Sequence, residues 1–357
     1  MILEFGMANS TAPSSVAATI TGIAAGMALA HYLRPVLVPF FLAALLRIGV
    51  DAVVQLVANV LPKAPRWTIR LTTGGVMGTA IMAICYVVTQ GIGSVVSQVP
   101  AIVSKLDAIS RHFAFVTGSK DADLFSAAIR HVDGPALLQW LASGIHEPFQ
   151  IVLLTLLMSA FMLTAPNAEN NPKLDLVVRH AARAARQRAI IAHITSSIQN
   201  YMVVQLATNG AIGIAVAVAC LAIGLKAAMF WGATSFILAF IPVVGPIVAS
   251  VLPALSALVQ SSTEWQAIAV FVAVQVIFTV LHNLVLPKLQ AKSQNIDPIA
   301  GLLALGIWTL LWGVWGALLA TPLMMLIMIT MAQFESSRWF AALLSHDGRP
   351  ATGSDAE

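Results

Sequence analysis

The chain has 357 residues, of which 59% are hydrophobic and only 10% are charged. A soluble domain carries roughly 25% charged residues, so this composition argues against a soluble enzyme and indicates an integral membrane protein. The net charge of +4 is small and spread along the chain. It suggests membrane topology and no nucleic-acid partner.

The apolar runs have the length of helices. Membrane β-strands need only about ten alternating residues, whereas most of these runs exceed 17 residues, and a helix needs about 20 to cross a bilayer. Only helices satisfy their own backbone hydrogen bonds in lipid. We therefore predict an all-α integral membrane protein, a polytopic helical bundle of about eight spans with broken helices and an extramembrane helical insert. The runs are 16–30, 35–60, 71–92, 148–165, 202–225, 227–259, 267–286 and 296–332.

The first run begins near Val16 with no lysine or arginine in front of it. A cleavable signal has a basic segment there, so we expect a first membrane helix that is retained. Only "HYLRP", residues 31–35, separates this run from the second. We expect the two runs to form a hairpin with a very short connection.

Basic residues between the runs orient the bundle. They fall on one side if the N-terminus is cytoplasmic, as the positive-inside rule favours; they are Lys63, Arg66, Arg70, Lys173, Arg179, Arg183, Arg186, Arg188, Lys288 and Lys292. The resulting organisation has seven parts: a cytoplasmic tail (1–15), membrane helices (16–93), an extracytoplasmic helical insert (94–147), a membrane helix (148–165), cytoplasmic arginine-bearing helices (166–201), a C-terminal membrane bundle with broken helices (202–333) and a cytoplasmic tail (334–357). The expected location is the bacterial inner membrane, with several crossings and both termini in the cytoplasm.

The insert begins with an amphipathic helix. Apolar residues recur at steps of four and three from Val95 to Phe113, which places them in one stripe along a helix. We expect this stripe to dock onto its own chain; the alternative is a contact between subunits, since a similar period forms coiled-coil seams.

No residue pattern indicates catalysis. The chain lacks the paired-histidine zinc motif, the GxSxG elbow and the phosphate-binding glycine loop. Cys85 and Cys220 lie within apolar runs, where cysteine packs as a small hydrophobic side chain. We therefore expect no enzyme activity, no cofactor, no disulfide and no metal site.

A few polar side chains interrupt the apolar runs, where they are costly and usually pair or line a pathway. Arg47 and Asp51 are four residues apart and could form an ion pair, or Asp51 could titrate with protons. Two helix faces carry the other polar candidates, which either bond neighbouring helices or line a solute path: Gln205, Thr208 and Asn209 on one, Gln275 and His282 on the other.

Helix-breaking residues lie inside two apolar runs. "FIPVVGPIVAS", residues 240–250, contains Pro242, Gly245 and Pro246, and the last run contains "WGVWG" and "TP" between Ile307 and Pro322. Breaks at membrane depth are tolerated where the freed backbone faces protein or a water-filled cavity, and transporters use them to bind solutes. We expect a solute site among these breaks and the connector 281–298; the alternative is a tight turn between short helices at each break.

These same residues resemble the autoinducer-2 exporter family of bacterial membrane proteins. "FIPVVGPIVASVLPAL" resembles that family's IPxxGP segment, and residues 282–323 resemble its later stretch of polar, proline and glycine positions. The matching positions are Pro242, Gly245, Pro246, Asn283, Pro287, Lys292, Pro298, Gly313, Gly316 and Pro322. The sequence departs at His282, where many members carry an acidic residue, and at Ala291, where a glycine precedes the lysine; the residue before the last connector proline is Asp297.

The resemblance implies about eight membrane helices per subunit, a homo-oligomer, and either export of the signal autoinducer-2 or exchange of sodium or lithium for protons. We expect a transporter that exports a small polar solute by alternating access. A monovalent cation/proton antiporter is the first alternative, and a membrane scaffold that transports nothing is the second. The expected break residues are Pro242, Gly245, Pro246, Pro287, Pro298, Gly313, Gly316 and Pro322; the expected pathway residues are Asp51, Gln205, Asn209, Gln275, His282, Asn283, Lys288, Lys292 and Asp297.

Overall fold

The computed structural model describes residues 15–60, 65–117, 150–164, 181–261, 263–290 and 296–348. These residues are almost entirely helical, with one isolated β-bridge between Ile296 and Ser345. The expected all-α membrane bundle is therefore confirmed for this part of the chain. Five of its helices are long and apolar enough to cross a membrane, and four more are apolar but shorter.

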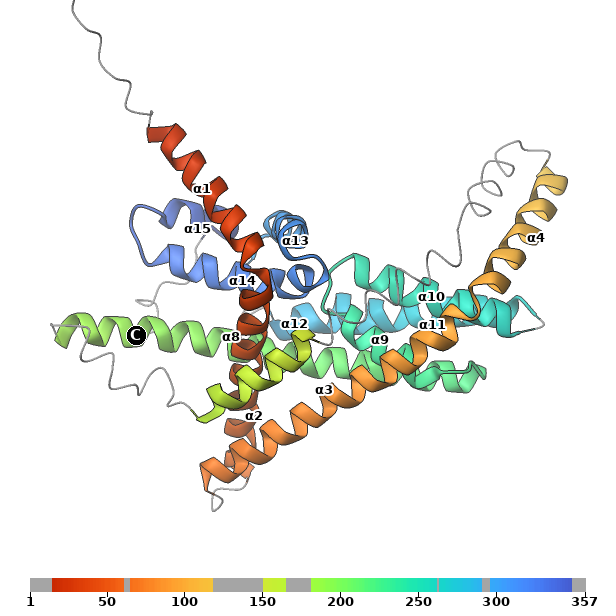
Figure 1. The fold of residues 1–357 in the computed structure, drawn as a ribbon, viewed down its shortest axis with the longest axis horizontal. Coiled ribbons are helices and arrows are strands. Elements are labelled where there is room, and N and C mark those ends of the chain that lie inside the picture. Colours follow the sequence, from red (N-terminus) through yellow and green to blue (C-terminus); the bar gives the residue numbers. More distant parts are fainter. Residues whose placement is uncertain are drawn as a thin grey trace, which may run out of the picture.

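The N-terminal helices do not form the expected hairpin. Helix α1 (Ser15–Tyr32) runs into α2 (Arg34–Val60), and only Leu33 separates them. The α-helical hydrogen-bond pattern continues across this residue, because the Leu33 N–H donates to Leu29 O and the Leu37 N–H donates to Leu33 O, both at 2.9 Å. Figure 1 shows the two helices following one another without a reversal. The expected cytoplasmic location of the N-terminus assumed that these two runs cross the membrane as a hairpin. The structure removes that assumption.

Helices α3 (Arg66–Val96) and α4 (Val99–Thr117) carry the chain away from the bundle (Figure 1). The amphipathic segment expected there is helical. Its first half lies against α10, whereas Ile109 further along is 38% exposed. The expected docking onto the chain itself is thus confirmed for the start of α4, and Phe113 lies outside the described side chains. The helix Gln150–Thr164 follows.

Helix α8 (Ala181–Ile223) is the longest helix in the described part of the chain, about 65 Å at 1.5 Å per residue. It joins the arginine-bearing segment to the fifth apolar run without interruption, so the boundary expected between residues 201 and 202 falls inside one helix. The described part of this segment is Ala181–Tyr201, and Arg179 and Lys173 lie outside it.

Both predicted breaks are present. The first separates α9 (Ala228–Leu238) from α10 (Val244–Gln260), and the second separates α13 (Pro298–Trp312) from α14 (Val314–Ala332) at Gly313. Helix α9 is only about 16 Å long, too short for a hydrocarbon core of about 30 Å. Each pair of helices packs together, so each break reverses the chain inside the bundle.

Between these pairs lies a helix with a π-helical insertion. Helix α11 (Trp265–Phe278) continues through η2 (Thr279–Val285) into α12 (Leu286–Gln290). Pro287 was expected to end a helix here, which is wrong. The widened π turn, in which the Leu286 N–H donates to Leu281 O, lies directly before Pro287; such insertions relieve the clash that a proline ring makes with the preceding turn.

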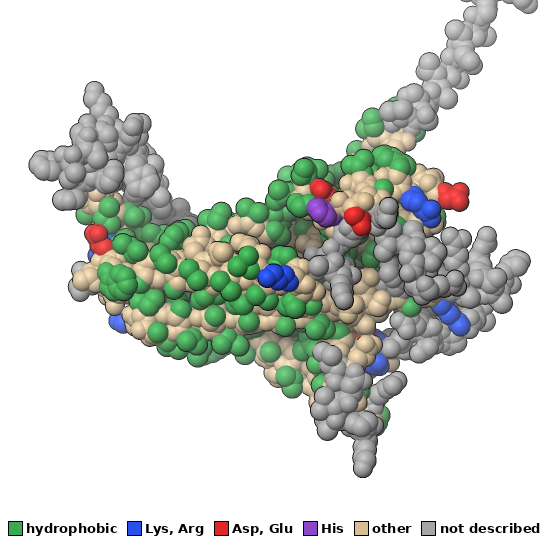
Figure 2. Space-filling view, turned by 180° about the vertical axis from the view of Figure 1, so that it is seen from behind, with side chains coloured by type: hydrophobic (Ala, Val, Ile, Leu, Met, Phe, Trp, Pro, Cys, Tyr) green, Lys and Arg blue, Asp and Glu red, His purple; other side chains and the backbone are tan. Residues whose placement is uncertain are grey.

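The C-terminal segment returns to the connector. Helix α15 (Arg338–Leu344) packs beside α14, and the Asp297 N–H donates to Leu344 O at 2.9 Å. Pro298 begins α13, as expected. In Figure 2 hydrophobic side chains are spread over the described part of the visible face and charged ones are few, as contact with lipid requires.

Candidate solute site

A buried polar stripe follows one face of α8. Tyr201, Gln205, Thr208 and Asn209 are all at least 95% buried, and their spacing of three and four residues aligns them on a helix. The Gln205 amide donates to Asn209 Oδ1 at 3.3 Å. Polar groups in such a position must find partners inside the bundle.

The first partner of this stripe is the α9–α10 break. Gln205 Nε2 lies 3.4 Å from the carbonyl oxygen of Ala239, the residue that follows α9. This carbonyl is one of those that a helix end leaves without a partner in its own helix. The structure therefore brings together the predicted amide face and the predicted break.

The break itself is a tight turn at Val243. This residue has φ 63° and ψ −57°, and the Val244 N–H donates to Pro242 O at 2.6 Å. These values describe a γ-turn of the strained kind, which is unusual for a β-branched residue. Such strain is typical of functional sites.

Gly245 allows the two halves of the break to meet. A Cβ atom at this position would lie 1.9 Å from Leu238 O, so no larger residue fits without a backbone shift. Pro246 follows within the first turn of α10, where a proline costs no hydrogen bond. The local backbone geometry thus explains why glycine and proline occupy these two motif positions.

The second partner of the stripe is α14. Helix α14 contacts α8, and the side chain of Tyr201 lies near that of Thr321. Pro322, next to it, was expected to break the helix, which is wrong, because α14 continues from Val314 to Ala332. The second break lies at Gly313, with φ 64°.

Gly316 has a role near this second break, although it does not cause it. A Cβ atom at this residue would lie 1.8 Å from Trp308 O. The position therefore lets α14 lie directly against α13 after the turn.

Four buried polar atoms near the stripe have no hydrogen-bond partner among the described residues. They are Asn209 Nδ2 on α8, Trp231 Nε1 and Thr234 Oγ1 on α9, and His282 Nδ1 on η2. Leaving such a group unpaired costs about 1–3 kcal/mol. A membrane-embedded group of four is therefore a candidate for water or a bound solute.

The packing of α9 places two of these residues near the level of the stripe along the helix axes. Helices α8 and α9 run antiparallel, and Gly213 packs against Gly232 about two turns from the contact at the break. Trp231 and Thr234 flank Gly232 in the sequence. Measured along the helix axes, both residues therefore lie within about two turns of Asn209.

His282 reaches the same level from the other side. Gln266 at the start of α11 donates to Ile223 O at the end of α8, at 3.2 Å, so these helices are also antiparallel. His282 lies 16 residues beyond Gln266, and Thr208 lies 15 residues before Ile223. With η2 in contact with α8, the histidine is at the level of the stripe.

The membrane carboxylate is already engaged. Asp51 lies 2.9 Å from Arg47 and 3.0 Å from Arg70 of α3, and its side chain is 13% exposed. The expected Arg47–Asp51 pair is confirmed, and Arg70 adds a second cation. Within the described membrane helices Asp51 is the one acidic residue, so the polar stripe itself has no negative charge.

The remaining predicted pathway residues lie elsewhere. Asp297 caps α13, with its carboxylate accepting from the N–H groups of Ile299 and Ala300 at 2.9 and 3.1 Å. Asn283 and Lys288 are exposed and Gln275 is half-buried. Lys292 lies outside the described residues.

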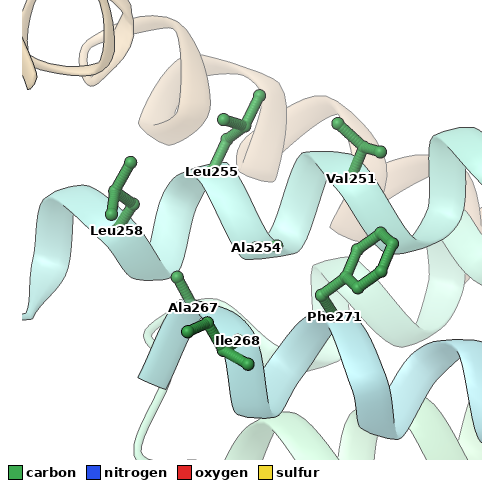
Figure 3. A pocket seen from close by; sticks show the side chains of 7 residues that line it. All are labelled: Val251, Ala254, Leu255, Leu258, Ala267, Ile268 and Phe271. Atoms are coloured by element: carbon green, nitrogen blue, oxygen red, sulfur yellow. The ribbon is translucent and has the colours of Figure 1, made fainter. Parts of the chain in front are cut away.

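A separate hollow among the described residues lies away from this site. It measures about 290 Å³ and lies between α10 and α11 (Figure 3). Its lining is entirely apolar, so it suits a lipid chain or another apolar surface and offers a polar solute no hydrogen bond. The lining residues are Val251, Ala254, Leu255, Leu258, Ala267, Ile268 and Phe271.

Sequence reasoning missed several members of the site. Tyr201 lies one helical turn before Gln205, so extending the predicted face by four residues would have found it. Trp231 and Thr234 share no pattern with other polar residues, and Thr321 was noted only as part of a break. Their participation depends on how α9 and α14 pack.

A helical bundle in which paired broken helices meet a buried polar stripe has the architecture of a membrane transporter. The chain belongs to the AI-2E family of transporters, whose profile matches residues 20–336. It is a multi-pass protein of the bacterial inner membrane.

Relatives agree with this class. The AI-2 transport protein TqsA of Escherichia coli (strain K12) is 24% identical over 88% of this chain and 91% of its own. YhhT of the same strain, whose assignment as a transport protein is provisional, is 24% identical over 59% of this chain and 58% of its own. A Haemophilus influenzae protein with a similarly provisional assignment is 26% identical over 54% of this chain and 55% of its own.

Proposed function

We propose that this transporter exports a small, neutral, oxygen-bearing solute, with autoinducer-2 as the leading candidate. The observation that carries the proposal is the set of buried, unpaired polar atoms on Asn209, Trp231, Thr234 and His282, on the helices that pack around α8 and on α8 itself. The indole and amide nitrogens only donate hydrogen bonds, whereas the hydroxyl and the imidazole can donate or accept. Such a set suits hydroxyl, ether and carbonyl oxygens.

The charge balance favours this solute class over a cation. A monovalent cation/proton antiporter needs a carboxylate that can bind and release the ion. Asp51, which lies in a membrane helix, is held between Arg47 and Arg70. Asp297 accepts hydrogen bonds from a helix end. We therefore keep the antiporter as the competing outcome of the test.

In an alternating-access mechanism the two helix breaks would act as hinges and supply backbone polar groups. The helices that meet at Val243, and those that meet at Gly313, can tilt within the bundle while the backbone at each break supplies polar groups. The name of TqsA assigns it AI-2 transport. With family membership, this supports autoinducer-2 as the first solute to test, and with it a role in quorum sensing. Assembly as a homo-oligomer is proposed from the family resemblance alone.

The test is flux from proteoliposomes that contain the purified protein. Vesicles are loaded with labelled autoinducer-2 or with sodium, and efflux is followed with and without a proton gradient. The proposal predicts saturable autoinducer-2 efflux and no sodium flux above protein-free vesicles. Sodium flux coupled to protons would support the antiporter instead, and no flux of either would favour a scaffold.

A further inference from the structure

A hydrogen-bond network closes the end of the bundle that lies away from Asp51. Gln98, at the junction of α3 and α4, accepts from Ser256 Oγ at 2.8 Å and from Gln260 Nε2 at 3.1 Å. The side-chain oxygen Oε1 of Gln260 accepts from the Lys226 backbone N–H at 2.9 Å. The network thus joins α3, the α8–α9 turn and the end of α10.

Lys105 binds the same end of α10 beside this network. Its ammonium group donates to Leu258 O and, at 2.9 Å, to Ser261 O. Both carbonyls belong to the C-terminal end of α10, where unpaired carbonyls and the helix dipole favour a cation. A side chain of the extramembrane helix α4 therefore caps a helix of the membrane bundle.

Helix α10 connects this cap to the break. It spans Val244–Gln260, about 25 Å at 1.5 Å per residue. At its other end Gly245 lies directly against Leu238 O. One continuous helix, with Pro253 in its interior, therefore has the Lys105 cap at one end and the strained turn at the other.

We propose that Lys105 is a positioning residue that couples α4 to the α9–α10 break. By holding the C-terminal end of α10, Lys105 sets where the N-terminal end of α10 lies, and so keeps the Ala239 carbonyl against Gln205. The transport arm of the test rests on the proposed function; the structural arm does not.

The structural arm is hydrogen exchange on the full-length protein in nanodiscs. The reporters are the Ile241 and Gly245 amides at the break, which donate to Leu238 O and Ile241 O at 2.9 and 3.0 Å. Lys105→Met keeps an unbranched side chain but removes the charge and the donors. It should raise exchange by about tenfold both at the α10 C-terminus and at these two amides, because a hydrogen bond to a charged group is worth more than a factor of ten.

Two variants serve as controls. Lys105→Arg restores a charged donor and should return exchange at the break to the wild-type rate. Lys226→Met removes a positive charge from the exposed lysine at the same end, and should leave the break unchanged. Exchange that rises only within residues 258–261 in Lys105→Met, or nowhere, would overturn the proposal by showing a local cap. If Lys105→Met does not fold, Ser256→Ala removes the two hydrogen bonds that the Ser256 hydroxyl makes with Gln98 and Gln260 at the same end of α10. It should give a smaller rise at the break, and the absence of that rise would overturn the proposal equally.

The transport arm separates positioning from mere stability. In the efflux assay Lys105→Met should lower the maximal rate several-fold per folded molecule, and Lys105→Arg should recover it. A loss that disappears when rates are normalised to folded protein contradicts positioning. If the wild-type protein moves no solute, the proposed function fails, whereas the exchange result still decides the role of Lys105.

Discussion

Gly245 is a residue where local geometry and the family motif coincide. Its position admits no Cβ atom, because one would lie 1.9 Å from Leu238 O. We expect Gly245→Ala to destabilise the fold by about 1–3 kcal/mol, the usual cost of overpacking, and to lower the melting temperature measured in detergent. Gly301→Ala is the matched control, since that helical glycine has open space around it and should melt at the wild-type temperature or slightly above it. Equal melting temperatures for the two variants would contradict the close approach at the break.

The two carboxylates that the sequence offered for ion coupling make a second prediction at this scale. Asp51→Asn removes the shared partner of Arg47 and Arg70, and breaking a buried ion pair costs about 3–5 kcal/mol, less where arginine is partly exposed. Asp297→Asn keeps a good helix cap and should change stability little. Both variants should retain solute efflux per folded molecule. If either variant loses efflux while circular dichroism shows an intact fold, the carboxylate that it replaces takes part in transport, which would contradict this prediction.

Among the elements, the α9–α10 break stores strain at Val243. A valine at φ 63° costs about 1–3 kcal/mol, whereas glycine adopts this conformation freely at an entropic cost of about 0.5–1 kcal/mol. Val243→Gly should therefore raise the melting temperature. Val244→Gly, one residue later at the start of α10, should lower it. If Val243→Gly melts below the wild-type protein, the turn is not strained in solution.

Sequence patterns predicted the elements unevenly, for physical reasons. The breaks at Pro242–Gly245 and at Gly313 were predictable because proline and glycine act on their own backbone. The continuation of the helices through Pro287 and Pro322 was not predictable, because a π turn or the surrounding bundle can keep a helix intact at a proline. The supposed hairpin after α1 failed because a short polar "HYLRP" interrupts hydropathy without interrupting hydrogen bonds.

For the molecule as a whole, the sequence predicted an all-α membrane bundle and a polar face on α8, because both follow from hydropathy and helical period. It could not predict which helices cover that face. Packing between segments far apart in the chain brings Gln205 to Ala239 and Tyr201 near Thr321. It also places His282 at the same level along the helix axes as Thr208. These contacts convert scattered polar residues into one candidate site.

The central claim is that the unpaired polar atoms on α8 and on the helices around it bind the exported solute. The most direct measurement is the concentration dependence of autoinducer-2 efflux in Thr234→Val, which keeps the shape of the side chain and removes its hydroxyl. Thr330→Val is the control, because the Thr330 hydroxyl already donates to Leu326 O within its own helix. Losing one hydrogen bond of about 0.5–1.5 kcal/mol should raise the half-saturating concentration about two- to tenfold in Thr234→Val and leave it unchanged in Thr330→Val. The same half-saturating concentration in both variants and the wild-type protein would contradict the account.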